Sequence, residues 1–214
     1  MKIGVLGTGV VGSTLAGGFA ALGHEVSVGT RDASSDKAKA LAAKLGPKVA
    51  VVPFAEAASF AETGVLATLW SGTESAIRLA GPQHLAGKVV IDTTNPLVFA
   101  PGAAPELALG HRDSGGEQVQ RWLPGARVVK AFNIVGNAHM VHPTFPGGPP
   151  DMFICGNDAP AKRTVTSLLK ELGWPAIDIG GIEGARVLEP LCILWVLFGA
   201  RTGSWNHAFK LLRK

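Results

Sequence analysis

The chain of 214 residues contains no tyrosine, and this absence excludes any catalytic scheme in which a tyrosine–lysine pair relays a proton. Cysteine is also scarce. Cys155 and Cys192 are the whole complement, which is too few for a disulfide framework. Unpaired cysteines are typical of a reducing compartment, so the sequence predicts a cytoplasmic protein.

Long hydrophobic runs are missing too. The longest, LCILWVLFGA over 191–200, is about half of what a membrane-spanning helix needs, so we expect a buried or interface helix and no membrane span. Met1 is followed at once by the apolar segment KIGVLG, which is unlike a secretory signal peptide. With 47% hydrophobic and 17% charged residues, the composition indicates a folded globular chain.

The charge is modest and spread along the chain, with 20 Lys and Arg against 16 Asp and Glu. No basic stripe alternates with aromatic residues, which argues against a nucleic-acid partner, whereas a slight positive balance suits an anionic small molecule. His139 and His142 lie in NAHMVHP without a third ligand nearby, so no metal site is predicted. His139 remains a candidate for contact with a substrate.

Apolar strand-like and helix-like segments alternate from the first residue. We expect strands over 2–7, 25–30, 48–52, 64–69, 88–93, 127–132, 151–156 and 175–180, and helices over 10–22, 35–45, 56–62, 74–80, 116–123 and 159–172. This alternation is typical of an α/β fold of the Rossmann type, doubly wound, with a mostly parallel sheet covered on both faces.

The pattern changes near residue 180. We expect residues 1–180 to form the main domain and 181–214 a short helical extension of two helices broken near Gly203. Trp205, Phe209 and Leu212 would share one face of the second helix. The extension would serve either as a homodimer contact or as a cover over the site. Two long loops, over 94–114 and 133–150, follow predicted strands at the sheet edge where such folds bind ligands.

A glycine motif follows the first strand directly. Gly7, Gly9 and Gly12 form G-x-G-x-x-G between a predicted strand and a predicted helix. Gly7 allows the tight turn, Gly9 allows a pyrophosphate to approach the backbone, and Gly12 allows close packing of helix and strand. The amide groups of the following helix start would meet the negative charge. The segment therefore predicts a dinucleotide site.

The end of the second strand indicates which dinucleotide binds. Binding of NAD usually needs an acidic residue there, but this chain has Thr30 and Arg31, with Lys37 shortly after. A hydroxyl and a guanidinium suit a phosphate, which favours NADP(H). Asp32 is the complication, since it could bind a ribose hydroxyl instead. The segment DASSDK is also typical of a helix start, with Asp32, Ser34 or Ser35 as the cap.

Several segments together resemble a known family. The segments GTGVVGSTLA, GTRD, DTTNPL, VVKAFN and FICGNDAPAKRTVTSLLKELGWPAIDIG are similar to those of the coenzyme F420-dependent NADP reductases, which pass hydride between NADP and a deazaflavin. The later segments also resemble the NADPH-binding module of the six-transmembrane metalloreductases. The resemblance covers nearly all of residues 1–180.

The resemblance implies roles by position. The pyrophosphate would lie against Thr8, Gly9, Val10 and Val11, and the 2′-phosphate against Thr30, Arg31 and Lys37. The ribose and nicotinamide would be lined by Leu69, Trp70 and Ser71, over a floor shaped by Asn95, Pro96, Ala131, Phe132 and Asn133.

The resemblance also implies an NADP-dependent oxidoreductase with a small-molecule redox acceptor, either coenzyme F420 or a flavin. The deazaflavin enzymes tend to carry His near the position of Asn133, which leaves the acceptor open. Asn133 and His139 are the candidates for a catalytic role. The alternatives are reduction of a small carbonyl or imine, and a non-catalytic NADPH-sensing module.

Overall fold

The computed structural model describes residues 1–100 and 102–214 and contains one central sheet of eight strands. The strands lie side by side in the order β10-β9-β8-β5-β4-β1-β2-β3. Their bounds are β1 Lys2–Leu6, β2 Glu25–Thr30, β3 Val49–Pro53, β4 Thr63–Leu66, β5 Val89–Asp92, β8 Arg127–Lys130, β9 Met152–Gly156 and β10 Ala176–Asp178.

Neighbouring strands in this sheet are parallel except for the pair β8 and β9. The carboxyl ends of β1 to β5 and β8 therefore meet at one edge of the sheet. The predicted Rossmann-type, mostly parallel sheet is confirmed, and each predicted strand overlaps an observed one. The central strands β1, β2, β4, β5 and β8 form because buried Val, Ile and Leu dominate them.

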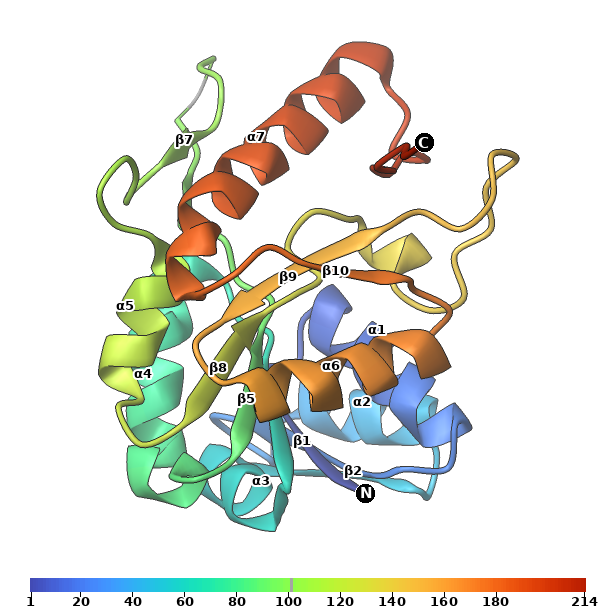
Figure 1. Ribbon diagram of the computed structural model, residues 1–214. Helices are drawn as coiled ribbons and strands as arrows, with labels where there is room; N and C mark the ends of the chain where they lie inside the picture. Colours follow the sequence, from blue (N-terminus) through green and yellow to red (C-terminus); the bar gives the residue numbers. More distant parts are fainter. Residues whose placement is uncertain (101) are drawn as a thin grey trace.

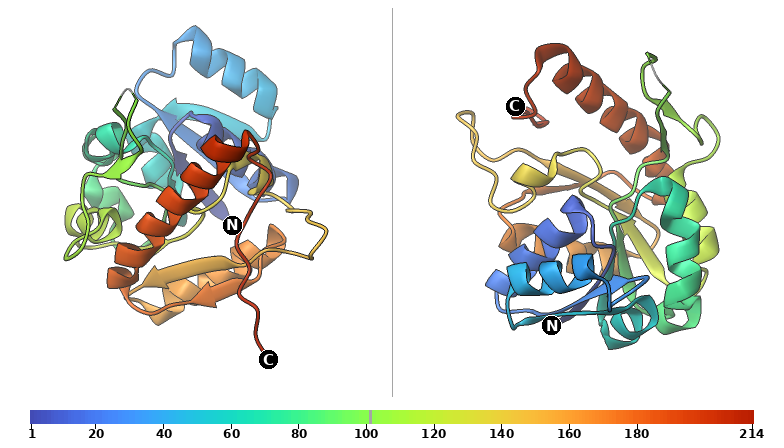
Figure 2. Two further views of the ribbon diagram at one scale, coloured as in Figure 1. Left: turned by 90° about the horizontal axis from the view of Figure 1, so that it is seen from above. Right: turned by 180° about the vertical axis from the view of Figure 1, so that it is seen from behind.

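Helices cover both faces of the sheet (Figures 1 and 2). One face packs on α1, α2 and α6 through Leu15, Phe19, Leu41 and Val165. The other face packs on α3, α4 and α5 through residues such as Ile77. The bounds of these helices are α1 Val10–Ala21, α2 Asp36–Leu45, α3 Phe54–Phe60, α4 Trp70–Ala80, α5 Gly115–Trp122 and α6 Ala159–Glu171, with short 3-10 turns η1 Pro82–Leu85, η2 Asn137–His139 and η3 Ile182–Gly184.

The last helix, α7 (Ala185–Thr202), crosses above the carboxyl edge of the sheet, and Figure 1 shows it beside a small antiparallel ribbon. That ribbon, β6 (Leu97–Val98) with β7 (Glu106–Leu107), belongs to the first long loop. The 191–200 run is helical as expected, with Cys192 and Trp195 buried and Leu194 and Phe198 exposed.

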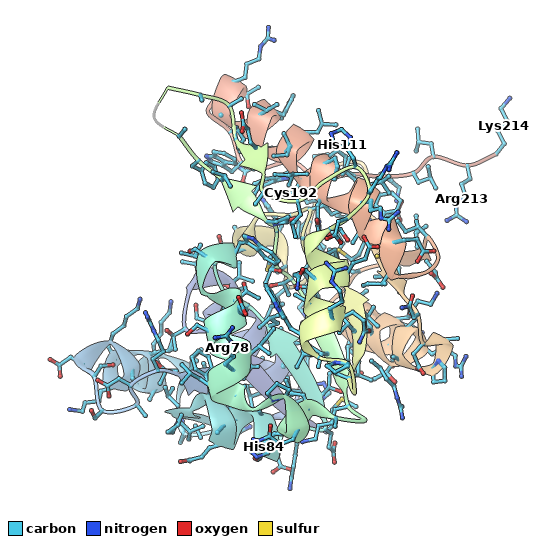
Figure 3. All side chains as sticks on the ribbon, turned by 90° about the vertical axis from the view of Figure 1, so that its left-hand side faces the viewer. Arg78, His84, His111, Cys192, Arg213 and Lys214 are labelled. Atoms are coloured by element: carbon cyan, nitrogen blue, oxygen red, sulfur yellow. The ribbon has the colours of Figure 1, made fainter. Side chains whose placement is uncertain are left out.

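The predicted second helix after Gly203 was wrong. Gly203 has a φ of 67°, and this left-handed conformation ends α7. The remaining chain is extended because its backbone bonds to the segment before β9: the amide of Asp151 donates to the carbonyl of Phe209, and the amide of Leu211 donates to Asp151 Oδ2 at 2.8 Å. Figure 3 shows Arg213 and Lys214 at the end of this projecting tail.

Trp174 supports a prediction about stability. Its side chain is 2% exposed, lies in the core between α6 and β10, and donates from Nε1 to the Met140 carbonyl at 2.9 Å. Replacing Trp174 by alanine should lower the free energy of unfolding by about 3–5 kcal/mol, since a large apolar volume and a buried hydrogen bond are both lost. Urea denaturation followed by circular dichroism measures this. A change below about 1 kcal/mol would contradict the assigned core.

Candidate functional site

The passage from β1 into α1 depends on three glycines, of which Gly7 and Gly9 lie in the loop and Gly12 in the first turn of α1. Gly7 has a φ of 135°, and its amide donates to the carbonyl of Gly29 at 3.1 Å. A Cβ at Gly7 would clash with the Ala67 carbonyl, and one at Gly12 with the Gly7 carbonyl. A Cβ at Gly9 would meet no atom within 4 Å. Gly7 and Gly12 are therefore required by the fold, whereas Gly9 leaves open space above the loop.

This loop borders a cleft of about 430 Å³ at the carboxyl edge of the sheet. The cleft lies where the chain, after β3, crosses to the other side of β1 to form β4, which is the switch point at which open α/β sheets bind ligands. The loops after β1, β4 and β5 line it, with Gly9, Val10, Val11, Ala67, Thr68, Leu69, Trp70, Ser71, Thr93, Thr94, Asn95, Leu97 and Phe99.

Seven of the residues that the sequence assigned to a cofactor lie in this lining: Gly9, Val10, Val11, Leu69, Trp70, Ser71 and Asn95. Gly7 and Thr8 belong to the same loop, and Gly12 lies in the first turn of α1. Pro96 is buried beside the lining, and Ala131, Phe132 and Asn133 are buried at the end of the neighbouring strand. Thr68, Leu97 and Phe99 were not assigned from the sequence, because Thr68 falls inside a predicted strand and Leu97 and Phe99 are apolar loop residues with no chemical signal of their own.

Three further candidates lie beside the glycine loop, at the end of β2. Thr30 is the last residue of β2, Arg31 follows it and is exposed, and Lys37 lies in the first turn of α2. Arg31 and Lys37 form no ion pair with any residue that the structure describes. Their charges are therefore available to an anion.

Asp32 turns back into its own loop. Its Oδ1 accepts hydrogen bonds from the Ser34 amide at 2.8 Å and the Ser34 hydroxyl at 2.6 Å, and these bonds lower the pKa of the carboxyl. The helix cap itself is Ser35, whose hydroxyl accepts from the amide of Ala38. The arrangement favours a turn-forming role for Asp32 over contact with a ribose.

A network of amides joins the ends of β5 and β8. Asn95 Nδ2 donates to the Asn133 carbonyl at 2.8 Å, and Asn133 Nδ2 donates to Asn95 Oδ1 and to the Leu188 carbonyl of α7. Phe132, which directly precedes Asn133, has a φ of 63°, a strained conformation for a bulky residue. The burial of its side chain maintains this conformation. These bonds make the region beside the cleft rigid.

An ionic cluster lies directly beneath this network. Lys130 is fully buried, and its Nζ lies 2.8 Å from Asp92 Oδ2, 3.1 Å from Glu189 Oε1 and 2.7 Å from the Thr94 carbonyl. Burial opposes the charge of Lys130, but attraction to Asp92 and Glu189 outweighs it, so the pKa of the amine is raised and it stays protonated. Burial raises the pKa of Glu189, against the pull of Lys130.

The sequence analysis missed this cluster. Its visible signals were a lysine inside the apolar strand RVVKAF and a glutamate between Leu188 and Pro190 in an apolar helix. Neither residue indicates its partner, because the two lie on elements far apart in the sequence.

His139 lies away from the cleft lining. Its Nε2 is 3.2 Å from Asn206 Oδ1, and its ring packs against Phe145 with centroids 4.8 Å apart. These contacts join the tail to the second long loop. A role of His139 in contact with a substrate stays a prediction.

Residues 1–100 and 102–214 contain no grouping of three or more His, Cys, Asp or Glu side chains that could hold a metal ion. Within the same residues, no helix has both the length and the apolar character that crossing a bilayer needs.

The two thiols support a prediction about reactivity. Burial raises the pKa of Cys155 to about 12 and that of Cys192, which lies on α7 (Figure 3), to about 11. Since the thiolate is the reactive form, both should stay unmodified by a disulfide reagent at pH 8. A colorimetric assay should detect fewer than about 0.1 thiols per native chain and both after denaturation in guanidinium. Rapid modification of either native thiol would contradict the burial described.

Comparison with known proteins places these features in context. A family model described as NADP oxidoreductase, coenzyme F420-dependent, matches residues 2–96. The F420-dependent NADP reductase of Methanothermobacter marburgensis is 34% identical, over 99% of this chain and 98% of that protein. A crystal structure described as a putative F420-dependent NADP reductase from an Arthrobacter species is 42% identical over 100% of both chains, with a TM-score of 0.93.

A second group of relatives is larger than this chain. The rat metalloreductase STEAP3 is 31% identical over 191 residues, which are 89% of this chain and 36% of the metalloreductase. The chain thus spans about a third of the length of that relative. The likeness concerns only the part of the metalloreductase that aligns.

Proposed function

The chain belongs to the F420-dependent NADP reductase family and is an NADP-dependent oxidoreductase, and on this premise we propose that it transfers hydride between NADP(H) and coenzyme F420. The observation that carries the proposal is the identity of 34% over nearly the whole length of both chains with an F420-dependent NADP reductase. A full-length match supports a shared reaction better than a match to one motif does.

The adenosine half of the dinucleotide would be held at the glycine loop and the end of β2. Backbone amides of Thr8, Val10 and Val11 would face the pyrophosphate above Gly9, where open space supports a close approach. Thr30, Arg31 and Lys37 would bind the 2′-phosphate, and the absence of ion pairs at Arg31 and Lys37 among the described residues supports this.

The nicotinamide half would lie between the loops after β4 and β5. Leu69, Trp70 and Ser71 would line one side, with Thr94 and Asn95 opposite them. Pro96, Ala131, Phe132 and Asn133 would support this end from below. When bound, NADPH supplies a hydride, and a deazaflavin ring accepts it together with a proton. No side-chain acid is needed for the hydride itself, since proximity and ring orientation dominate such a step.

The rim of the cleft suits a flat acceptor. Val10, Leu69 and Phe99 are 66%, 84% and 68% exposed, an unusual grouping of apolar side chains around one opening. An aromatic ring system would cover them and exclude water from the transferred hydride. We place coenzyme F420 here, with a flavin as the alternative acceptor.

The extension over 181–214 would complete the acceptor side or meet a second copy of the chain. The helix α7 passes above the carboxyl edge of the sheet (Figure 2). Its residues Val187, Leu194, Leu197 and Phe198 are exposed. A homodimer would bury this face. Analytical ultracentrifugation with and without Leu194→Glu distinguishes a dimer contact, which the variant would dissociate, from a cover within one chain.

Anaerobic stopped-flow kinetics tests the proposed reaction. NADPH is mixed with the protein and coenzyme F420, FMN or FAD, and absorbance is followed at the bands of nicotinamide and acceptor. Oxidation of NADPH matched by reduction of F420 supports the proposal. Turnover with a small imine or ketone alone would favour the carbonyl or imine reductase alternative, and tight NADPH binding without turnover would favour the sensing module.

A further inference from the structure

We propose that Lys130 is a positioning residue that fixes the main chain of Thr94 against the nicotinamide half of NADP(H) and couples this position to the C-terminal helix α7. The inference rests on the proposed function, because the placement of Thr94 affects the cofactor only if the nicotinamide lies beside it. Neither Lys130 nor its carboxylate partners line the cleft themselves.

Thr94 is held at each of its polar atoms. Its amide and hydroxyl both donate to Asp92 Oδ1, at 2.9 and 2.7 Å, and its carbonyl accepts from Lys130 Nζ at 2.7 Å. Asp92 and Lys130 are paired across β5 and β8, so their side chains project together. Thr94, which lines the cleft, is therefore restrained by Asp92 at its amide and hydroxyl and by Lys130 at its carbonyl.

Glu189 brings α7 into the same arrangement. Its Oε1 lies 3.1 Å from Lys130 Nζ and accepts from the Gly116 amide, while its Oε2 accepts from the Gly115 amide. These are amides at the start of α5, which have no partner within that helix. A Cβ at Gly116 would lie 3.0 Å from Lys130 Cε and 2.8 Å from the Ala185 side chain, so the glycine leaves room for the lysine.

The cluster joins three elements around one cation. Thr94 belongs to the loop after β5, Gly115 and Gly116 start α5, and Glu189 belongs to α7. Three ionic groups buried together are costly unless each is satisfied, and replacing all of them by neutral groups is often harmless to stability. Stability alone therefore gives a weak reason for the cluster. Its contact with a cleft residue points to positioning.

A pair of ligands tests this. 2′,5′-ADP carries the adenosine and the 2′-phosphate but lacks the nicotinamide, whereas NADPH carries both halves. In Lys130→Met the Kd for NADPH should rise about tenfold, since a hydrogen bond to a charged group that orders the site is lost. The Kd for 2′,5′-ADP should change less than about twofold, because its contacts lie at the glycine loop and β2. Isothermal titration calorimetry measures both.

Two further variants distinguish a positioning role of Lys130 from a general loss of stability. Lys130→Met, Asp92→Asn and Glu189→Gln combined leave no buried charge, so stability should recover while the selective loss of NADPH persists. Lys162→Met, which breaks an ion pair with Asp178 on α6 and β10, is the matched control and should change neither Kd. In steady-state assays of the Lys130 variants, the fold decrease in kcat should exceed the fold increase in the KM for the acceptor.

If the Lys130 variants do not fold, the inference can be tested on the wild-type protein. The buried Nζ of Lys130 is suited to detection by 15N NMR, and NADPH should shift its resonance while 2′,5′-ADP leaves it in place. An equal rise in Kd for both ligands, an unchanged Kd for NADPH, or equal shifts of the Lys130 resonance with both ligands would overturn the inference. Wild-type protein that binds neither ligand would instead refute the proposed function, and this inference with it.

Discussion

Replacing Arg31 by alanine should raise the Kd for NADPH by about ten- to more than a hundredfold and leave the Kd for NADH within about twofold. A charge-assisted hydrogen bond contributes about 1.5–3 kcal/mol to binding. NADH has no 2′-phosphate and therefore does not form this bond. Arg31 is exposed, follows directly on Thr30 at the end of β2, and forms no ion pair among the described residues, so its removal should not disturb the fold. Fluorescence titration of the bound nicotinamide measures both constants.

Arg163→Ala provides a matched control for this experiment. Arg163 is also exposed and unpaired among the described residues, but it lies on α6, which packs against β9 rather than at the glycine loop. This variant should bind both nucleotides as the wild type does. Equal weakening of NADPH and NADH by Arg31→Ala would show that the guanidinium does not read the 2′-phosphate.

Replacing Gly9 by alanine should weaken NADPH binding while changing the melting temperature little. Gly9 has a φ of −72°, which alanine adopts without strain, and an added Cβ meets no protein atom within 4 Å. The methyl group would instead occupy the space proposed for the pyrophosphate. Overpacking of this kind costs about 1–3 kcal/mol or more, so the Kd for NADPH should rise at least about fivefold.

Two other glycines separate binding from folding. Gly12→Ala forces a Cβ into the Gly7 carbonyl, so it should lower the melting temperature by several degrees as well as weaken NADPH. Gly147→Ala also adds a Cβ into open space, but in the second long loop, and should change neither property. Unaltered NADPH binding in Gly9→Ala would place the pyrophosphate elsewhere. Differential scanning fluorimetry with and without NADPH measures both effects in each variant.

Much of the fold could be predicted because local signals agree with it. The strand over 25–30 was predicted to the residue, since its alternation ends in polar residues and both flanks carry turn or cap signals. The helix α4 begins at Trp70, whereas the sequence predicted a start at residue 74. The start was misplaced because ATLW is typical of a continuing strand and because the N-cap, Leu69, has no side-chain hydrogen bond that would mark it. The tail over 203–214 was misjudged, since its backbone partner, the segment around Asp151, is distant in sequence.

The candidate site could likewise be predicted only in part from the sequence. The glycine loop and the end of β2 could be predicted because each is a short contiguous motif whose chemistry depends on neighbouring residues. The sequence offered Asp32 either as a ribose ligand or as a cap of the next helix. In the structure the cap is Ser35, and Asp32 bonds to Ser34 in the turn before it. The Lys130 cluster could not be predicted, because its meaning depends on three elements that only the folded chain brings together.

A crystal structure of the complex with NADP⁺ would show whether the dinucleotide binds in this cleft as proposed. We expect the 2′-phosphate within hydrogen-bonding distance of Arg31 and Thr30, the pyrophosphate above Gly9, and the nicotinamide beside Thr94. A dinucleotide whose ribose is instead bound by Asp32, with Arg31 turned into solvent, would contradict this proposal.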